Sequence, residues 1–185
     1  MSERGGSKKS SRILAPMHTV SSGALRLPFR FQQQRAGSES DLRFLERRWT
    51  PRTVFMDVGA PDCALALKAA TYVDRVYAID VSGHFVQNLL APVNLRLVLC
   101  DGVRIPVPDA SVDLAWSGAF TAHLHADDLR EHLKNMLRIL VPGGQYVFSS
   151  IQTRELFAAG FSAVRGYAGG WRVPLRFASH IVGIK

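Results

Sequence analysis

The feature that most constrains this chain is an alternation, from Thr53 onward, between short apolar runs and longer segments with apolar residues at helical spacing. The apolar stripe from Leu129 to Leu140 is the longest of these helical segments. Strands that alternate with helices favour a parallel sheet covered by helices, because each parallel connection must cross over the sheet. The sequence therefore predicts an α/β fold: a doubly wound, mostly parallel seven-stranded sheet with helices on both faces.

The boundaries of the elements follow from turn and capping residues. Ser38 and Asp41 have the spacing of a capping box, and Asp127 is expected to cap the helix that carries the long stripe. Pro51 is expected to end the first helix, and Pro142 with the two glycines after it to stop the long one. Strands are predicted at 53–58, 75–80, 95–100, 112–116, 145–149, 162–167 and 178–184, and helices at 38–50, 62–72, 82–90, 127–141 and 153–159.

The basic character of the chain is concentrated near its N-terminus. Residues 1–52 hold eleven Lys and Arg against four Asp and Glu, whereas residues 53–185 hold twelve against eleven. We therefore predict two parts: residues 1–37, a basic and disordered segment, and residues 38–185, the folded domain. A solvated tail is the favoured interpretation of the first part, and an organelle transit peptide is the alternative. Nucleic-acid binding is a further possibility, supported here only by the basic charge, since no aromatic residues alternate with the basic ones.

Composition also excludes several classes of protein. No run approaches the roughly 18 apolar residues of a membrane span, so no membrane partner is expected. The two cysteines, Cys63 and Cys100, do not suggest a disulfide framework. A reducing, cytoplasmic setting is the simplest interpretation, and no metal site is predicted.

Two residues at the predicted strand ends suggest a ligand. Gly59 follows the first strand, where a glycine lets the backbone approach a ligand and the next helix presents free N–H groups. Asp80 ends the second strand, 21 residues later, where its carboxylate can accept hydrogen bonds from both hydroxyls of a ribose. Nicotinamide dehydrogenases share this spacing. A nucleotide site and a plain structural turn both remain open on these residues alone.

Five motifs in order resemble the core of the class I S-adenosylmethionine-dependent methyltransferases, and the resemblance covers roughly residues 40–185. TVFMDVGAPDCALAL resembles the first motif of the family, and VYAIDVS the second. LCDGVRIPVPDASVDLAWS resembles the third and fourth, and LRILVPGGQYVFS the last. The Pro-Gly-Gly turn in this last motif has no role in a nicotinamide oxidoreductase, which makes that class a distant alternative.

The resemblance implies S-adenosylmethionine as cofactor and a set of residues that bind it. Asp80 takes the place of the ribose ligand, and Asp101 with Gly102 that of the adenine contact. The full implied set is Asp57, Gly59, Ala60, Pro61, Asp80, Val81, Asp101, Gly102 and Ser117. His123 and His125, after the fourth strand, are candidates for a general base or for orienting substrate. The alternative is that they only cap or pack around the entrance of the next helix.

Two departures from the family pattern bear on activity. Pro61 stands where the family has a second glycine, and proline offers no N–H and has a fixed φ. Only residues 150–152 separate the fifth strand from the next helix, where relatives commonly carry an insertion over the substrate. Cys63, beside a helix start, is expected either to have a lowered pKa or to pack against the sheet. Trp116 and Phe120 are expected in the core or as walls of the cofactor pocket.

Three function classes follow. The favoured one is a methyltransferase that acts on a small-molecule substrate by direct in-line transfer, because the domain is nearly neutral. The second is a methyltransferase-like binding protein with impaired activity, which Pro61 supports. The third is a methyltransferase of RNA or protein, for which the basic N-terminal segment is the support.

Overall fold

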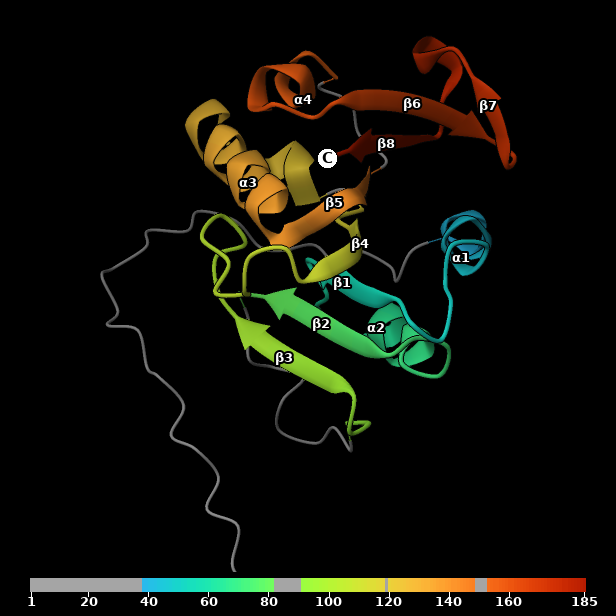
Figure 1. The fold of residues 1–185 in the computed structure, drawn as a ribbon, viewed down its shortest axis with the longest axis vertical. Helices are drawn as coiled ribbons and strands as arrows, with labels where there is room; N and C mark the ends of the chain where they lie inside the picture. The colour runs from blue at the N-terminus through green and yellow to red at the C-terminus, as the bar shows by residue number, and fades with distance from the viewer. Residues whose placement is uncertain (1–37, 82–90, 119, 149–152) are drawn as a thin grey trace, which may run out of the picture. The chain divides into compact units, whose positions relative to one another are not determined.

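The computed structural model describes residues 38–185 apart from 82–90, 119 and 149–152 (Figure 1). These residues form one eight-stranded sheet in the order β3-β2-β1-β4-β5-β8-β6-β7. The strands are β1 (Val54–Val58), β2 (Arg75–Asp80), β3 (Leu95–Leu99), β4 (Val112–Trp116), β5 (Leu140–Phe148), β6 (Ala163–Ala168), β7 (Trp171–Val173) and β8 (His180–Ile184). The first five are mutually parallel, and β8 is antiparallel to both β5 and β6. The prediction of a doubly wound, mostly parallel sheet is confirmed.

Helices cover both faces of this sheet, as predicted (Figure 1). On one face, α1 (Glu39–Glu46) and α2 (Ala64–Ala69) bury Leu45 and Ala66 against the alternate strand residues Phe55 and Leu114. On the other, α3 (Ala126–Ile139) and α4 (Thr153–Ala159) pack on the remaining strand residues. Two short 3-10 helices, η1 (Phe120–His123) and η2 (Leu175–Phe177), complete the described elements. No helix in the described ranges is long and apolar enough to cross a membrane.

The predicted strand count was one too low, because β7 was missed. β7 forms a tight hairpin with β6, in which Ala168 pairs with Trp171 across a turn of Gly169 and Gly170. Both glycines have positive φ, 57° and 90°, as the tightest hairpin turns require. A three-residue strand gives too little alternation in the sequence to be detected, whereas the glycine pair that makes its turn is visible there.

Three expected boundaries also moved. The capping box holds, since the Asp41 N–H donates to Ser38 Oγ (3.2 Å) and the Ser38 N–H to the Asp41 carboxylate (2.7 Å), but α1 ends at Glu46, so Trp49 lies outside the helix. Asp127 does not cap α3: His125 holds that position, and Asp127 pairs with Arg130 in the first turn. The Pro-Gly-Gly segment belongs to β5, with a register shift against β4 between Val112 and Leu114. The expected helix at 82–90, the N-terminal segment and residues 150–152 lie outside the described residues.

Candidate functional site

The implied cofactor residues converge on one edge of the sheet. Strand pairing places Asp57 between Ala78 of β2 and Trp116 of β4, and Asp80 beside Leu99 of β3. The segments that follow β1, β2, β3 and β4 therefore all leave the sheet at the same carboxyl edge. In doubly wound sheets this edge is where ligands bind.

The loop after β1 uses most of its own hydrogen-bond donors. The N–H groups of Gly59 and Ala60 both donate to the carbonyl of Ile79, at 2.9 and 3.1 Å. Further along, the Cys63 N–H donates to the Ala60 carbonyl (3.3 Å) and the next N–H to the Asp62 carboxylate (3.0 Å). Pro61, which is exposed, has no N–H. The expectation that the following helix presents free N–H groups is wrong for Cys63 and Ala64 at its start, and the loop N–H groups of Gly59 and Ala60 are used as well.

Cys63 occupies a strained backbone position. Its φ of 53° and ψ of 12° are left-handed, a conformation that glycine adopts far more readily than cysteine. Its side chain is fully buried, and burial raises the pKa of the thiol to about 12, with Asp57, Asp62 and Asp80 adding to the effect. The expectation of a lowered pKa at this helix start is wrong, and the alternative expectation, packing against the sheet, is confirmed.

Asp57 is buried directly beneath the loop. Only 4% of its surface is exposed, and burial raises the pKa of its carboxyl to about 7, with Asp62 and Asp80 as additional causes. A hydrogen bond from the backbone of Ala66 acts in the opposite direction. Three carboxyl groups thus act on one another around this loop, which makes it electrostatically negative.

Phe120 packs over two glycines of the site. A Cβ on Gly59 would lie 3.3 Å from the Phe120 Cβ, and a Cβ on Gly102 would overlap the Phe120 ring. Both glycines have positive φ, 79° and 73°. The absence of side chains here therefore makes room for Phe120, a buried core residue that packs against both the loop after β1 and the loop after β3.

His132 is a site residue that the sequence analysis missed. It is fully buried, with Nδ1 2.6 Å from the Gly102 carbonyl oxygen and Nε2 2.7 Å from the Tyr146 hydroxyl. Because a carbonyl oxygen only accepts, Nδ1 carries the proton, and the Tyr146 hydroxyl donates to Nε2. Burial lowers the pKa of His132 to about 4, so the ring is neutral at physiological pH. A histidine between the apolar Leu129 and Leu133 on the inner face of α3 was the signal in the sequence.

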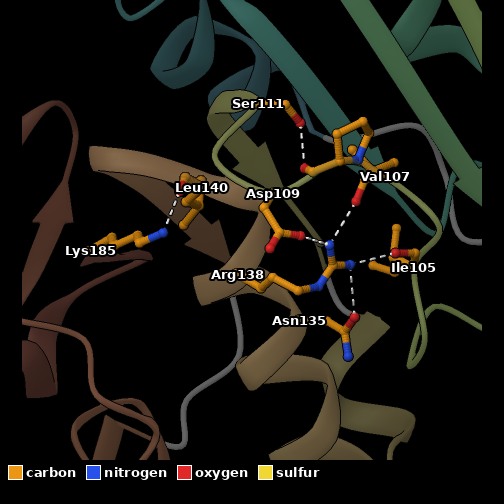
Figure 2. A network of polar contacts seen from close by, with 9 residues as sticks. Ile105, Val107, Asp109, Ser111, Asn135, Arg138, Leu140 and Lys185 are labelled. Atoms are coloured by element: carbon orange, nitrogen blue, oxygen red, sulfur yellow. Dashed lines mark hydrogen bonds and ion pairs between the residues drawn. The ribbon is translucent and has the colours of Figure 1, made fainter.

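Arg138, six residues after His132 on α3, contacts a later part of the loop that follows β3 (Figure 2). Its guanidinium donates to the carbonyls of Ile105 and Val107, both at 2.8 Å, and pairs with Asp109. Helix α3 thus fixes the loop after β3 at several points through His132 and Arg138.

The polar groups placed to meet a ligand at this edge lie at the ends of β2, β3 and β4. Asp101 is exposed, and one of its oxygens accepts from the N–H groups of Val103 and Arg104, at 2.8 and 2.9 Å. Asp80 is half-buried, and Val81 beside it is 38% exposed. Ser117 is 2% exposed, and its hydroxyl makes no hydrogen bond of standard geometry within the described residues. A weaker hydrogen-bonding interaction with the Tyr146 hydroxyl opposes the rise that burial causes in the pKa of Tyr146.

These groups fit a nucleoside better than they fit the remainder of the cofactor. Carboxylates at neighbouring strand ends and a buried hydroxyl suit the hydroxyls and ring nitrogens of a nucleoside. The loop after β1, in contrast, offers few donors to an anionic group. Across the described residues, no cluster of three or more His, Cys, Asp or Glu could hold a metal ion.

The two candidate catalytic histidines lie on the segment that follows Ser117. His123 ends η1 and His125 precedes α3, and both side chains are exposed. The His125 side chain makes no capping hydrogen bond with α3. Their place at the carboxyl edge of the sheet is compatible with contact to a substrate.

Comparisons with known proteins agree with this geometry. Dimethylglycine N-methyltransferase of Parasynechococcus marenigrum is 33% identical over 102 residues, 51% of this chain and 36% of that protein. Ribosomal RNA-processing protein 8 of Rattus norvegicus is 28% identical over 116 residues, 63% of this chain and 21% of that protein. The chain thus spans about a third and a fifth of the length of these curated relatives.

A solved structure and a family model are also similar to this chain, and both are methyltransferases. A TehB-like S-adenosylmethionine-dependent methyltransferase from Corynebacterium glutamicum has the same fold, with a TM-score of 0.63, 15% identity and coverage of 80% of this chain and 87% of that one. The family described as "Methyltransferase domain" matches residues 56–148, half of the chain. The chain belongs to this family, the class I Rossmann-like methyltransferases that use S-adenosylmethionine.

Proposed function

We propose that the chain binds S-adenosylmethionine through Asp80, Asp101 and Ser117 and transfers its methyl group to an acceptor at the carboxyl edge of the sheet. The observation that carries the proposal is the buried Ser117 hydroxyl, which makes no hydrogen bond of standard geometry among the described residues and follows β4 at the same edge of the sheet as the Asp80 and Asp101 carboxylates. A buried polar group without a hydrogen bond costs about 1–3 kcal/mol. A ligand that bonds this hydroxyl would recover that free energy.

The cofactor supplies a reactive sulfonium methyl group, so the protein mainly has to align the acceptor and exclude water. Phe120 forms an apolar wall over the glycines of the site. His132 and Arg138 hold the loop after β3 and thereby position Asp101. We assign His123 and His125 to orienting the acceptor, or to removing its proton where it carries one at working pH.

For the acceptor, a small molecule is our first proposal. The near neutrality of residues 53–185 supports it, as does the similarity to a dimethylglycine N-methyltransferase. An RNA acceptor is the second candidate, supported by the similarity to an RNA-processing protein. We place the protein in the cytoplasm, a proposal that both unpaired cysteines support.

The competing hypothesis is a methyltransferase-like binding protein without activity. It is supported by Pro61, by the left-handed Cys63 and by the loop donors that the chain itself uses. Calorimetric titration with S-adenosylmethionine and S-adenosylhomocysteine tests the proposal. Asp80→Ala should weaken binding by about 1.5–3 kcal/mol, the range for a hydrogen bond to a charged group.

The matched control is Asp74→Ala, which removes an exposed carboxylate just before β2, at the opposite edge of the sheet. This control should leave the affinity unchanged. Absence of binding heat in the wild type, or equal losses in the two variants, would refute the proposed site.

A further inference from the structure

The last fifth of the domain carries an unbalanced positive charge. Residues 156–185 contain four Lys and Arg and no Asp or Glu. Three of these residues are exposed, among them Arg165 on β6 and Arg172 on β7. Neither Arg165 nor Arg172 makes an ion pair among the described residues, so their charge is available to a partner.

Strand pairing places these two arginines on one face. Arg165 and Tyr167 alternate along β6, and Tyr167 pairs with Arg172 across the hairpin. Alternate residues of a strand and paired residues of antiparallel strands share a face of the sheet. This is the face that α1 covers, since Phe44 of α1 meets Tyr167 with ring centroids 5.4 Å apart.

The residues just after α1 add two more arginines to the same place. The half-buried Arg48 guanidinium donates to the Phe44 carbonyl (2.9 Å) and lies 3.6 Å from the centroid of the Phe44 ring and 5.0 Å from that of Tyr167. The Arg47 guanidinium lies against Gly170, where any side chain on that residue would overlap it. The carboxylates of α1 do not neutralise this group: Glu39 pairs with Arg43, Asp41 bonds His180, and Glu46 forms no ion pair within the described residues.

Topology connects this group to the candidate site. Because β6 and β5 are both antiparallel to β8, they run parallel to each other, and the hairpin turn after β6 projects from the carboxyl edge. Side chains also bridge the two places, since His180 stacks on Phe44 (4.2 Å) and lies 6.1 Å from Trp116, next to Ser117. A polymer bound at the hairpin is therefore directed along the edge that carries the site.

We propose that Arg47, Arg48, Arg165 and Arg172, here named the arginine face, bind the sugar–phosphate backbone of a single-stranded nucleic acid. Within the described part of the chain these four guanidinium groups form no ion pair with a carboxylate, so they repel one another, and a row of phosphates removes that repulsion. Planar guanidinium groups also match phosphate oxygens in a bidentate manner.

An exposed tryptophan favours a single strand over a duplex. Trp171, beside Arg172, is 80% exposed and offers a surface on which an unpaired base can stack. Its side chain leaves β7 on the opposite face from Arg172. A strand that contacts both must cross the hairpin turn, where Gly169 and Gly170 carry no side chains to obstruct it.

The test is a titration of the full chain with a labelled 20-nucleotide oligouridylate at several salt concentrations. The variant Arg165→Ser/Arg172→Ser should weaken binding on the order of tenfold at 0.1 M salt and reduce the slope of log K against log salt by about 1.4. The matched control is Arg75→Ser/Arg96→Ser, which removes two exposed arginines from β2 and β3 at the other end of the sheet. It should leave the slope unchanged.

Trp171→Ser should weaken binding at least about fivefold with the salt slope intact, because stacking is not electrostatic. Equal losses in the two arginine variants would overturn the proposal, since binding would then follow net charge alone. Tighter binding to a 20-base-pair duplex or to anionic lipid vesicles, or no binding to the oligonucleotide, would overturn it as well. None of these measurements depends on methyl transfer, so the proposal and the enzymatic function fail independently.

Discussion

The two ends of the sheet differ in charge as well as in strand direction. Residues 54–116, which include the parallel strands β1 to β4, hold seven Asp and four Lys and Arg, whereas residues 156–185, which form β6 to β8, hold four Lys and Arg and no acid. The near neutrality of residues 53–185 is therefore the sum of an acidic parallel end and a basic antiparallel end. An average charge over the domain had favoured a small-molecule acceptor, but it hid this separation.

Among the variants of the parallel end, we expect replacement of His132 to cause the largest loss of stability. His132→Leu would remove the hydrogen bonds that the His132 ring makes with the buried Gly102 carbonyl and Tyr146 hydroxyl. We expect a loss of about 2–5 kcal/mol in the free energy of unfolding, at about 1–3 kcal/mol for each group. Urea unfolding measures this loss.

Tyr146→Phe added to His132→Leu should recover part of this loss, because the second change removes one of the two unsatisfied groups. Losses that simply add would contradict the coupling. The salt slope of the arginine face should stay the same in these variants, which separates the two ends of the sheet.

Two buried groups of the parallel end make the free energy of unfolding depend on pH in opposite directions. The pKa of His132 is lowered from 6.5 to about 4, so its contribution to stability is lost as pH falls from 6.5 towards 4. The pKa of Asp57 is raised from 3.8 to about 7, so the folded state keeps a proton that the unfolded state releases, and stability falls as pH rises from 4 to 7.

Between pH 4 and 6.5 these two contributions cancel. Asp57→Asn should therefore make the free energy of unfolding rise by about 1.4 kcal/mol per pH unit over this range, and His132→Leu should make it fall by a similar amount. Thermal or urea unfolding at pH 4.5, 5.5 and 6.5 would distinguish the two slopes. Slopes of the same sign in both variants would contradict the assignment.

Arg138 gives a smaller effect on the same loop. Arg138→Lys keeps the charge but cannot donate at once to the carbonyls of Ile105 and Val107. We expect a loss of about 1–3 kcal/mol in unfolding free energy and faster proteolysis between residues 101 and 111. Arg130→Lys, in an exposed ion pair with Asp127, is the control and should change stability by less than about 0.5 kcal/mol.

The sequence predicted the parallel end well because its signals there are local. Each strand is a compact apolar run, and each strand end is marked by a glycine or an acid such as Gly59 or Asp80. Strands in register then carry these residues to one edge without further information. The α1 capping box was equally visible, since both partners lie within four residues.

The missed features depend on contacts between distant residues. The His132 ring forms hydrogen bonds with Gly102 and Tyr146, which are 30 and 14 residues away. The Ile79 carbonyl accepts from the N–H groups of the loop after β1 only because β1 and β2 pair. The arginine face likewise joins residues more than 110 positions apart in the chain. The predicted lowering of the Cys63 pKa was wrong for a related reason. Proximity to a helix start suggested a lower pKa, but burial of the thiol beside three carboxyl groups raises it.

Pro61→Gly is expected to have the smallest effect, and it separates an active enzyme from an inactive relative. Pro61 is exposed, and the loop around it is already held by bonds from Gly59 and Ala60 to Ile79. If this loop accommodates the cofactor as it stands, a glycine should change affinity less than about threefold, or lower it by loosening the loop. If the proline instead blocks binding, the wild type should bind weakly, and the glycine, which opens space and returns an N–H, should tighten binding on the order of a hundredfold. We expect the first outcome, because Pro61 is exposed and Asp80, Asp101 and Ser117 keep groups suited to the ligand. Calorimetric titration of both forms with S-adenosylhomocysteine decides between them, and a tight-binding variant beside a silent wild type would refute the enzyme hypothesis.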